Sequence, residues 1–439
     1  MNEMTKHIDS GFFQMGGATL HSPPENGKLD IHGSVIIARA ASVEAIVEVL
    51  KQDIYYRSEV WDWEKRQIYP SKNQVHFALK MASETPTAIV QRGTSLVVEE
   101  TQLPALKEHQ VCVKVEGAAF NPTDRLAFDL NAFGDGAVLG CEFTGLVTRT
   151  HPSVTKLAPG DRVAALVWGG EIKGLGAYST YSIADERLSY KVPTTLNNAQ
   201  ACSIPLALNT AWLALFSKDC LALSWDASAQ KPQLLVWGGS SAVGYCAIQL
   251  ARLHGFVVAT TCSPRNFEQA KEAGATHVFD YRDEDVIAKL EAAVPQLSHV
   301  FDTIGNATSS ATAARAIGAR PGALCTVRPG KANTQDVPQN INVTDVFVFT
   351  GFPTPHTYRG SAHWPVHMED HKLSVELYDQ IPALLSDGSL KPLLTENIGI
   401  LSPRSVKKAM DMNRAGQVSA RKLCFEVPGR TKQRGLITI

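Results

Sequence analysis

The sequence lacks the features that mark membrane, secreted and nucleic-acid-binding proteins. It contains no apolar stretch of about 18 residues and no apolar segment near its first residue, so it predicts neither a membrane-spanning helix nor a secretory signal. Lys and Arg (42) nearly balance Asp and Glu (43), and a formal net charge of −1 provides no basic footprint for nucleic acid or an anionic membrane. We therefore expect a soluble, cytoplasmic protein without nucleic-acid or membrane partners.

Cysteine occurs without a metal or redox pattern. None of the eight cysteines forms a C-x-x-C pair. Cys112, Cys246, Cys325 and Cys424 lie inside apolar runs, as reduced thiols used as small core residues do. With 44 % hydrophobic and 19 % charged residues, the 439-residue chain can bury a full core and is long enough for roughly three units of about 150 residues.

A glycine-rich turn organises the second half of the chain. The apolar residues 234–237 end at Gly238, and apolar positions from Val243 to Leu253 recur with helical spacing. This pattern predicts a strand, a tight turn and a helix. The turn reads Gly239-x-Ser241-x-x-Gly244, a G-x-G-x-x-G pattern with serine in its middle position. Backbone N–H groups at such a helix N-terminus suit the diphosphate of a dinucleotide.

The next strand points to the cofactor. Residues 257–261 begin about 20 residues after the first strand, as a parallel strand returning through a right-handed crossover would. No Asp or Glu follows it to bind a ribose 2′-hydroxyl; Ser263 and Arg265 are there instead, and a guanidinium suits a 2′-phosphate. We predict NADPH rather than NADH. A βαβ unit that binds no nucleotide is the alternative.

The region before this turn has short strands and Gly/Pro turns. Residues 88–90 and 96–98 predict a hairpin, and residues 110–115 alternate as a strand. Asn121-Pro122-Thr123-Asp124 comes next, and it is followed by the motifs at residues 139–147 and 159–163. Together with residues 416–423, these motifs make residues 86–428 resemble the medium-chain dehydrogenase/reductases.

That resemblance implies an α/β fold in which a GroES-like β catalytic domain is split around a Rossmann domain, a doubly wound parallel sheet. The expected boundaries are 86–215 for the first part of the catalytic domain, 216–387 for the NADPH-binding domain, 388–428 for the second part and 429–439 for a tail. Zinc members of the family have a Cys at the position of Asn121 and a His at the position of Cys141. Neither position keeps the ligand that it has in zinc members, and a lone Cys141 beside Glu142 cannot make a zinc site, so we predict no metal.

A histidine cluster offers a competing metal interpretation. His363, His367 and His371 are spaced four residues apart, which would place three imidazoles on one face of a helix. Pro365 would disrupt a helix that started at residue 363, and no H-E-x-x-H motif is present. The start of a polar helix is the favoured interpretation.

Among the zinc-less reductases the chain resembles the fungal trans-acting enoyl reductases of polyketide biosynthesis. The residues that carry this likeness are 140–145, 203–211, 262–267 and 370–373. It implies hydride transfer from NADPH to an α,β-unsaturated acyl thioester, with a polyketide synthase as a possible partner. A broad-specificity quinone or enone reductase and a non-catalytic NADPH-binding protein are the alternatives.

The likeness also implies the site residues. Those for the cofactor are Asn121, Thr123, Asp124, Arg125, Gly239, Ser240, Ser241, Ala242, Val243, Gly244, Ser263, Pro264, Arg265, Asn266, Tyr281, Val327, Arg328, Val418 and Ser419. Those for the acyl substrate are Ser203, Ile204, Pro205, Leu206, Ala207, Leu208, Asn209, Thr210, Phe349, Thr350, Gly351 and Phe352. No proton donor is implied, because Leu126 stands where relatives have a lysine, and the catalytic residue stays unknown.

Residues 11–17, 33–34, 52–56 and 60–62 make the first 80 residues resemble an incomplete YCII-related α+β domain. Residues 33–39 and 60–70 predict strands and residues 42–50 an amphipathic helix. The family's first strand and most of its first helix have no counterpart in the chain, so we expect a segment that another chain completes or that is only partly ordered. His7 and Asp53 are the loose counterparts of that family's His–Asp pair.

Overall fold

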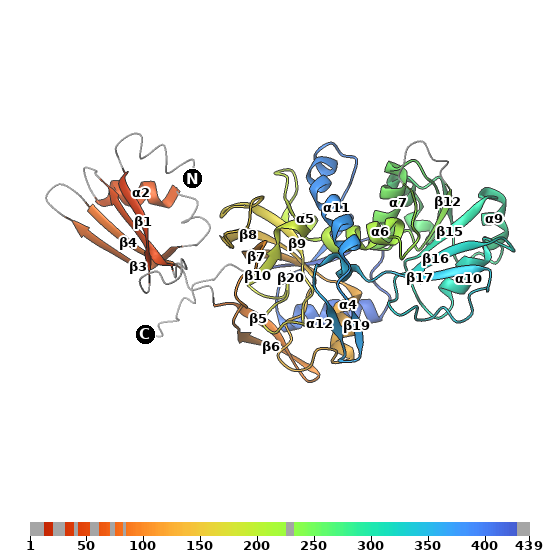
Figure 1. Ribbon diagram of the computed structural model, residues 1–439, viewed down its shortest axis with the longest axis horizontal. Coiled ribbons are helices and arrows are strands. Elements are labelled where there is room, and N and C mark those ends of the chain that lie inside the picture. Colours follow the sequence, from red (N-terminus) through yellow and green to blue (C-terminus); the bar gives the residue numbers. More distant parts are fainter. Residues whose placement is uncertain are drawn as a thin grey trace. The chain divides into compact units, whose positions relative to one another are not determined.

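The computed structural model describes residues 13–20, 31–38, 43–52, 61–70, 75–81, 85–224 and 232–427. The chain forms two compact units, Met1–Thr85 and Pro86–Ile439 (Figure 1). His7, Asp53 and the tail 429–439 lie outside the described residues.

The first unit contains a four-stranded antiparallel sheet in the order β1-β2-β4-β3. One helix, α2, follows β2, and its residues Ile46 and Leu50, four apart, are buried as expected for one face of an amphipathic helix. The expected strands and helix of this region appear, and β1 and β4 are additional strands. The bounds are β1 Phe13–Leu20, β2 Ile31–Ala38, α2 Val43–Gln52, β3 Trp61–Pro70 and β4 Val75–Met81.

The second unit begins with the catalytic domain. Its main sheet has seven strands in the order β11-β9-β8-β7-β21-β20, with β10 paired to β7. The last two strands come from the far end of the chain, so the domain is split in sequence as predicted. The elements are β5 Thr87–Arg92, β6 Ser95–Glu100, β7 Gln110–Ala119, α4 Pro122–Asp129, β8 Glu142–Thr150, β9 Arg162–Leu166, β10 Tyr181–Asp185, η1 Glu186–Leu188, β11 Ser189–Lys191, α5 Asn198–Cys202, α6 Pro205–Phe216, β20 Thr395–Ile400, α12 Pro403–Arg414 and β21 Lys422–Glu426.

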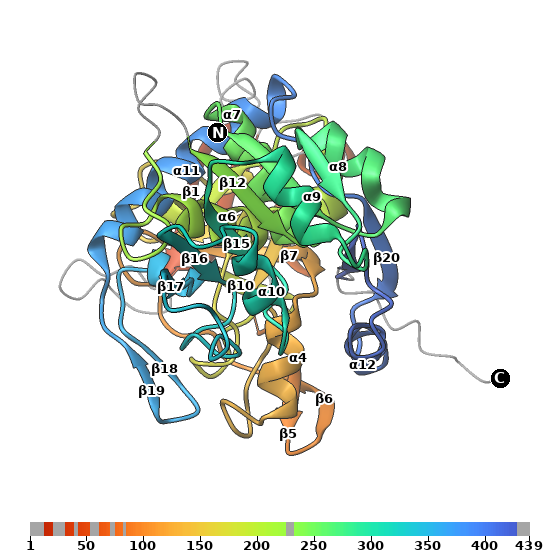
Figure 2. The same cartoon turned by 90° about the vertical axis from the view of Figure 1, so that its right-hand side faces the viewer.

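Inserted between these parts is a six-stranded parallel sheet in the order β14-β13-β12-β15-β16-β17 (Figure 2). This is the Rossmann strand order, so the predicted fold class is confirmed. The elements are β12 Gln233–Trp237, α7 Ala242–Leu253, β13 Val257–Thr261, η2 Pro264–Asn266, α8 Phe267–Ala273, β14 His277–Phe279, α9 Val286–Ala293, β15 Leu297–Asp302, α10 Ser309–Arg315, β16 Gly322–Thr326, β17 Ile341–Asp345, η3 Val348–Gly351, β18 His356–Tyr358, β19 Ala362–Trp364 and α11 Met368–Ser386.

Helices cover both faces of this parallel sheet. Along β12, Leu234 and Val236 pack in one hydrophobic cluster with α7 and α8, whereas Leu235 and Trp237 pack in another with α9 and α10. Because successive side chains of a strand point to opposite faces, a central strand buried on both faces reads as a continuous apolar run. Burial on both faces therefore explains the apolar run at residues 234–237 of the sequence.

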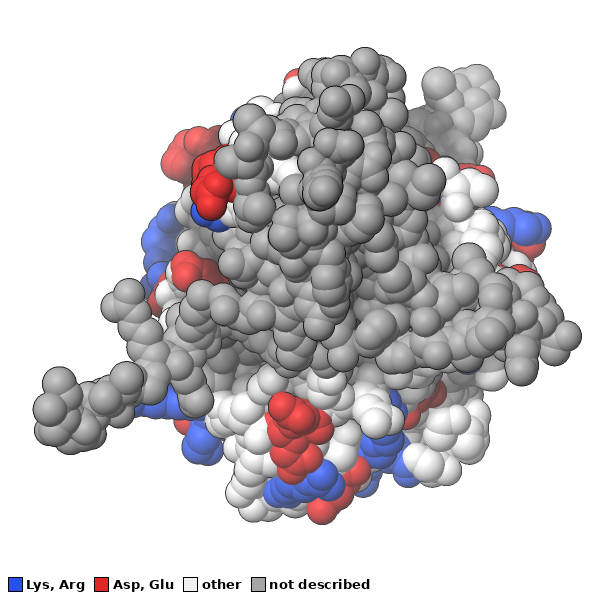
Figure 3. Space-filling view, turned by 90° about the vertical axis from the view of Figure 1, so that its left-hand side faces the viewer, with Lys and Arg blue, Asp and Glu red and all other residues white. Residues whose placement is uncertain are grey.

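Two features bear on whether the chain has a membrane or a charged macromolecule as a partner. The expectation of no apolar stretch of about 18 residues needs correction, because Asn198–Phe216 is a helical stretch apolar and long enough to cross a membrane. Since 89 % of its 18-residue apolar window is buried inside the protein, it resembles the core helix of a globular fold. On the face shown in Figure 3, the visible Lys and Arg side chains are interspersed with Asp and Glu side chains. No patch of one charge sign stands out among the described residues on that face.

Candidate functional site

The turn between β12 and α7 lies at the carboxyl end of the parallel sheet and leaves no room for a side chain at Gly239 or Gly244. A Cβ added to Gly239 would lie 2.1 Å from the Thr260 Oγ1, and one added to Gly244 would lie 2.3 Å from the Gly238 carbonyl oxygen. Glycine is therefore required for the helix to start this close to the strand. The close backbone approach is what a bound diphosphate needs.

Ser241, the serine in the middle of the motif, caps the helix. Its Oγ accepts a hydrogen bond from the Gly244 backbone N–H at 2.9 Å and is 2.8 Å from the Thr303 Oγ1. The hydroxyl thus satisfies one of the free N–H groups of the first turn and ties the motif to the end of β15. Thr303 was not predicted from the sequence.

The other predicted cofactor residues of this domain follow neighbouring parallel strands. Ser263 comes after β13, Tyr281 after β14, and Val327 and Arg328 after β16. Tyr281 is 47 % exposed, and the Arg282 guanidinium lies 5.5 Å from its ring centroid. The structure therefore gathers these residues along one edge of the sheet, where ligands bind in open α/β sheets.

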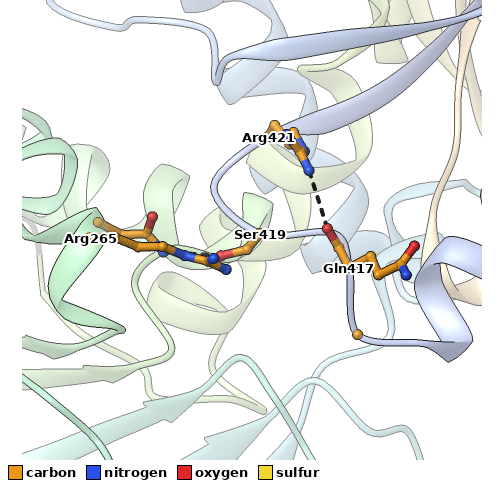
Figure 4. Close-up of a pocket in the computed structure, with 6 residues that line it drawn as sticks. Arg265, Gln417, Ser419 and Arg421 are labelled. Carbon is orange, nitrogen blue, oxygen red and sulfur yellow. Dashed lines mark hydrogen bonds between the residues drawn. The ribbon is translucent and has the colours of Figure 1, made fainter.

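A cavity of ≈ 570 Å³ opens between this edge and the second part of the catalytic domain (Figure 4). The Asn266 Nδ2 donates to the Ser419 Oγ at 3.0 Å, which joins two predicted cofactor residues from different domains. Arg265 extends toward Ser419 and has no ion-pair partner among the described residues. The lining residues are Arg265, Asn266, Gly416, Gln417, Ser419 and Arg421.

Gly416, Gln417 and Arg421 were missed by the sequence analysis. Arg421 pairs with the Glu396 Oε2 at 2.8 Å and donates to the Gln417 carbonyl at 3.3 Å. Their position in the sequence could have indicated them, because they flank the predicted cofactor contacts Val418 and Ser419 in one short loop. Arg421 places a second guanidinium beside the cavity that Arg265 lines.

Helix α4 carries the remaining cofactor residues. Asn121 caps this helix, and its backbone N–H donates to the Asp124 Oδ2 at 2.8 Å. Arg125 donates to the Asn413 Oδ1 at 2.8 Å and pairs with Asp129, so it connects α4 to α12. Thr123 is half-buried in the first turn of the helix.

Asp124 is the centre of a buried hydrogen-bond cluster. It accepts from the Tyr178 hydroxyl at 2.8 Å and from the Cys141 Sγ at 3.2 Å. Burial raises the pKa of Asp124 from 3.8 to about 6, although these donors lower it. Burial, together with the Asp124 charge, raises the pKa of Cys141 and of Tyr178 well above their ordinary values. Cys141 is therefore a neutral thiol.

A second buried cluster lies next to the first. The Lys422 Nζ is 2.6 Å from the Glu142 Oε1 and also donates to the Asn121 Oδ1. The Asn121 Nδ2 donates to the same Glu142 oxygen at 2.9 Å, and the Glu142 Oε2 accepts from the Leu206 backbone N–H at 2.8 Å. Burial lowers the pKa of Lys422, but the charge and hydrogen bond of Glu142 outweigh burial, and the pKa is raised. Lys422 was not predicted from the sequence.

These groups do not suit zinc. The two positions that hold ligands in zinc relatives carry a carboxamide and a protonated thiol, and an ammonium already pairs with the neighbouring carboxylate. Within the described part of the chain, no group of three or more His, Cys, Asp or Glu side chains could hold a metal ion.

The histidine cluster does not form the metal-binding helix face that its spacing suggested. His363 lies in β19, His367 caps α11 and His371 lies inside α11, so the three histidines do not share one helix face.

The two segments predicted to bind the acyl substrate are brought together. Residues 203–210 are all buried, and those from Pro205 onward lie in α6. A Cβ added to Gly351 of η3 would lie 3.0 Å from the Asn209 Nδ2 and 2.7 Å from the Ser374 Oγ. These polar groups of Asn209 and Ser374 have no hydrogen-bond partner among the described residues.

An aromatic cluster continues from η3. The Trp168 ring stacks on Phe349 with a centroid distance of 4.7 Å, and its edge contacts His356, also at 4.7 Å. The His356 Nδ1 is 2.8 Å from the Glu171 Oε2, and its Nε2 is buried without a partner in the described part of the chain. Other members are Phe133, Phe347, Phe352, Tyr358 and Trp364. The sequence offered no signal for the His356–Glu171 pair, whose members are 185 residues apart.

Known proteins resemble this chain in sequence and in fold. A family model described as "Alcohol dehydrogenase GroES-like domain" matches residues 107–194, and one described as "Zinc-binding dehydrogenase" matches residues 242–361. A trans-enoyl reductase of Alternaria alternata, ACTTS2, is 30 % identical over 346 residues, which cover 77 % of this chain and 98 % of that protein. A trans-enoyl reductase of Gibberella fujikuroi is 30 % identical over 338 residues, covering 76 % and 96 %.

Solved structures show the same fold. An alcohol dehydrogenase superfamily protein from Novosphingobium aromaticivorans superposes with a TM-score of 0.61 at 24 % identity, covering 78 % of this chain and all of that one. The CurK enoyl reductase superposes with a TM-score of 0.60 at 17 % identity, covering 79 % and 100 %.

Proposed function

We propose that this chain, which belongs to the medium-chain dehydrogenase/reductase family, is a trans-acting, NADPH-dependent enoyl reductase of polyketide biosynthesis. The observation that carries the proposal is the combination of two features: a cavity lined by Arg265 at the carboxyl end of the parallel sheet, and Asn121 and Cys141 at the two positions where zinc relatives have ligands. A site of this kind suits a substrate that conjugation activates. The relatives named trans-enoyl reductases support the same activity.

The residues present fit a nicotinamide cofactor. The turn at Gly239 and Gly244 is so close that Cβ atoms added there would clash, which leaves its backbone open to a diphosphate. Arg265, which has no ion-pair partner among the described residues, lines a cavity with Asn266 and Ser419. Residues 239–244 would hold the diphosphate at the N-terminus of α7. Ser263, Arg265 and Tyr281 would hold the adenosine 2′-phosphate, and a guanidinium offers it paired donors. Val327, Arg328, Val418 and Ser419 would contact the nicotinamide half.

When bound, NADPH supplies a hydride to the β-carbon of the unsaturated thioester, and the α-carbon then takes up a proton. The buried α6 and η3 segments would line the acyl channel. The aromatic cluster around Trp168 and Phe349 would exclude water from it and present an apolar wall to the acyl chain. A closed, dry site strengthens the electrostatic interactions within it.

The test is a comparison of substrates with the purified full chain. We expect NADPH-dependent reduction of crotonyl-CoA, at a kcat/KM at least about tenfold above that for a quinone, which corresponds to about 1.4 kcal/mol in transition-state stabilisation. Deuterium from C4-labelled NADPH should appear at the β-carbon of butyryl-CoA by mass spectrometry. Preferred turnover of the quinone would favour a quinone or enone reductase. Cofactor binding without turnover of either would favour a non-catalytic NADPH-binding protein.

The partner and the first unit belong to the same proposal. A carrier-bound acyl chain on a polyketide synthase would be the natural substrate, and the cytoplasm the place of action. The YCII-like interpretation of residues 1–80 stays a prediction, since the two matched family models lie entirely in the second unit.

A further inference from the structure

Lys422 is a buried cation in a family whose matched model is described as zinc-binding. Its side chain is 5 % exposed, and the side chain of its partner Glu142 is fully buried. Asn121 bonds to both, so the ammonium, the carboxylate and the carboxamide form a closed triangle. The two charged residues are far apart in the sequence: Glu142 begins β8 in the first part of the catalytic domain, and Lys422 begins β21 in the second part.

The Glu142 carboxylate needs a positive partner at this place. Its Oε1 accepts from Lys422 and Asn121, and its Oε2 accepts from the Leu206 N–H, so both oxygens are occupied by protein donors. A buried carboxylate without a counter-charge is strongly unfavourable. The Lys422 Nζ lies 2.6 Å from the Glu142 Oε1 and supplies that charge. Burial lowers the pKa of Lys422, but the charge and hydrogen bond of Glu142 outweigh burial and leave this pKa raised.

We propose that the Lys422 ammonium takes the place of a metal ion as the fixed cation of this site, and that it excludes divalent metals from it. To bind here, a metal ion would have to displace the Lys422 ammonium from its contacts with Asn121 and Glu142. If the ammonium stayed in place, its positive charge would repel the metal ion. The inference does not depend on the identity of the substrate.

The same side chain positions the loop that closes the cofactor pocket. Lys422 follows Ser419 and Ala420; Ser419 accepts from Asn266, and the Ala420 N–H donates to the Ser240 carbonyl at 3.1 Å. One end of this short loop is therefore held by the glycine turn and the other by the ion pair. Lys422 is a positioning residue, acting through the loop rather than on the substrate.

Metal binding provides a readout that is independent of turnover. The comparison uses the double variant Asn121→Cys/Cys141→His and the triple variant that adds Lys422→Met, each titrated with Co²⁺ and followed by the visible absorption of a tetrahedral site. We expect the triple variant to bind Co²⁺ at least about 100-fold more tightly than the double variant, because the competing charge is gone. Equal affinities in the two variants would overturn the proposal.

A second measurement covers the case in which these variants fold poorly. It compares Lys422→Met, Glu142→Gln and the combination of both for thermal midpoint and for NADPH affinity. We expect each single change to lower the midpoint and the combination to recover most of the loss, since it leaves no unpaired charge. Additive losses would overturn the proposal. Lys407→Met, the same chemical change on an exposed residue of α12, is the control and should alter neither quantity.

Discussion

At the scale of single residues, the chain separates charges that serve a ligand from charges that serve the fold. Arg265 is exposed and has no ion-pair partner in the described part of the chain, whereas Lys422 and Glu142 satisfy each other in the interior. An unpaired guanidinium beside a cavity is available to an anion. Removing one member of a buried ion pair leaves an uncompensated charge in the interior, which is strongly destabilising. Substitutions at these residues should therefore act on different quantities.

Arg265→Ala should weaken NADPH binding and leave NADH binding nearly unchanged. A hydrogen bond to a charged group contributes roughly 1.5–3 kcal/mol, so NADPH affinity should fall about 10- to 100-fold. Fluorescence titration of both cofactors into wild type and variant measures this. Arg315→Ala, the same change on an exposed residue of α10, serves as the control. Equal affinity of the wild type for NADH and NADPH would remove the basis of the prediction.

Asp124→Asn should alter the pH dependence of stability. The folded-state pKa of Asp124 is raised from 3.8 to about 6, so its protonated form is favoured in the fold. Its contribution to stability is then fully present below about pH 4 and is lost as the pH rises through about 6. Asparagine is isosteric and can still accept from Tyr178.

The measurement is the thermal midpoint of both proteins between pH 4 and 7.5. Relative to the variant, the wild type should lose stability as the pH rises, by at most about 3 kcal/mol for a pKa raised by about two units. Parallel profiles for the two proteins would show that Asp124 does not titrate in this range.

At the scale of elements, the glycine turn and α7 form the most constrained piece of the nucleotide domain. The helix start lies directly against the end of the strand, since a Cβ added to Gly244 would lie 2.3 Å from the Gly238 carbonyl oxygen. Ser241 completes the cap with a side chain where the usual motif has glycine. The geometry of this element therefore depends on Gly239 and Gly244 rather than on the middle position.

Gly244→Ala should impair cofactor binding through the backbone. The added methyl group would lie 2.3 Å from the Gly238 carbonyl, so the start of α7 must shift away from the strand. We expect NADPH affinity to fall at least about tenfold, because the N–H groups of the first turn move with it. Gly360→Ala is the control for backbone strain away from the cofactor site: its added Cβ meets no atom within 4 Å, but its φ of +68° makes alanine strained there, so it should lower stability and leave NADPH affinity unchanged. Wild-type affinity in Gly244→Ala would mean that the turn does not hold the diphosphate.

At the scale of the whole molecule, the second unit contains every element of the proposed reductase. Its two large sheets use strands from β7 onward, and no strand of the first unit joins them. The predicted cofactor and substrate residues, from Asn121 to Ser419, also belong to this unit. The reductase should therefore fold without the first unit.

A protein that begins at Met81 should keep wild-type turnover and cofactor affinity, with only a small shift in its thermal midpoint. Tolerance to truncation depends on how much of the removed backbone is paired and buried against the rest, and the first unit pairs its strands within its own sheet. Steady-state kinetics and thermal unfolding of the shortened protein and the full chain measure this. An insoluble product, or a loss of turnover above about tenfold (about 1.4 kcal/mol), would make the first unit an integral part of the enzyme.

The sequence by itself determined the parts of this protein that local pattern and motif spacing encode. Continuous apolar runs, helical spacing and glycine turns predicted the β12–α7–β13 unit, and the fold confirms it. The resemblance carried by the motifs implied a catalytic domain split around the Rossmann domain, and the fold confirms that as well. The residue types alone also showed Asn121 and Cys141 where zinc relatives have a Cys and a His.

Only the tertiary structure decided which distant side chains meet. Lys422 and Asn121 are 301 residues apart, and His356 and Glu171 are 185 apart, so neither pair leaves a local signal. Arg421 reaches the Arg265 cavity because the chain returns to complete the catalytic sheet. The cation that stands in the site comes from the last strand of that sheet, and its role follows from burial and pairing, which a linear sequence does not express.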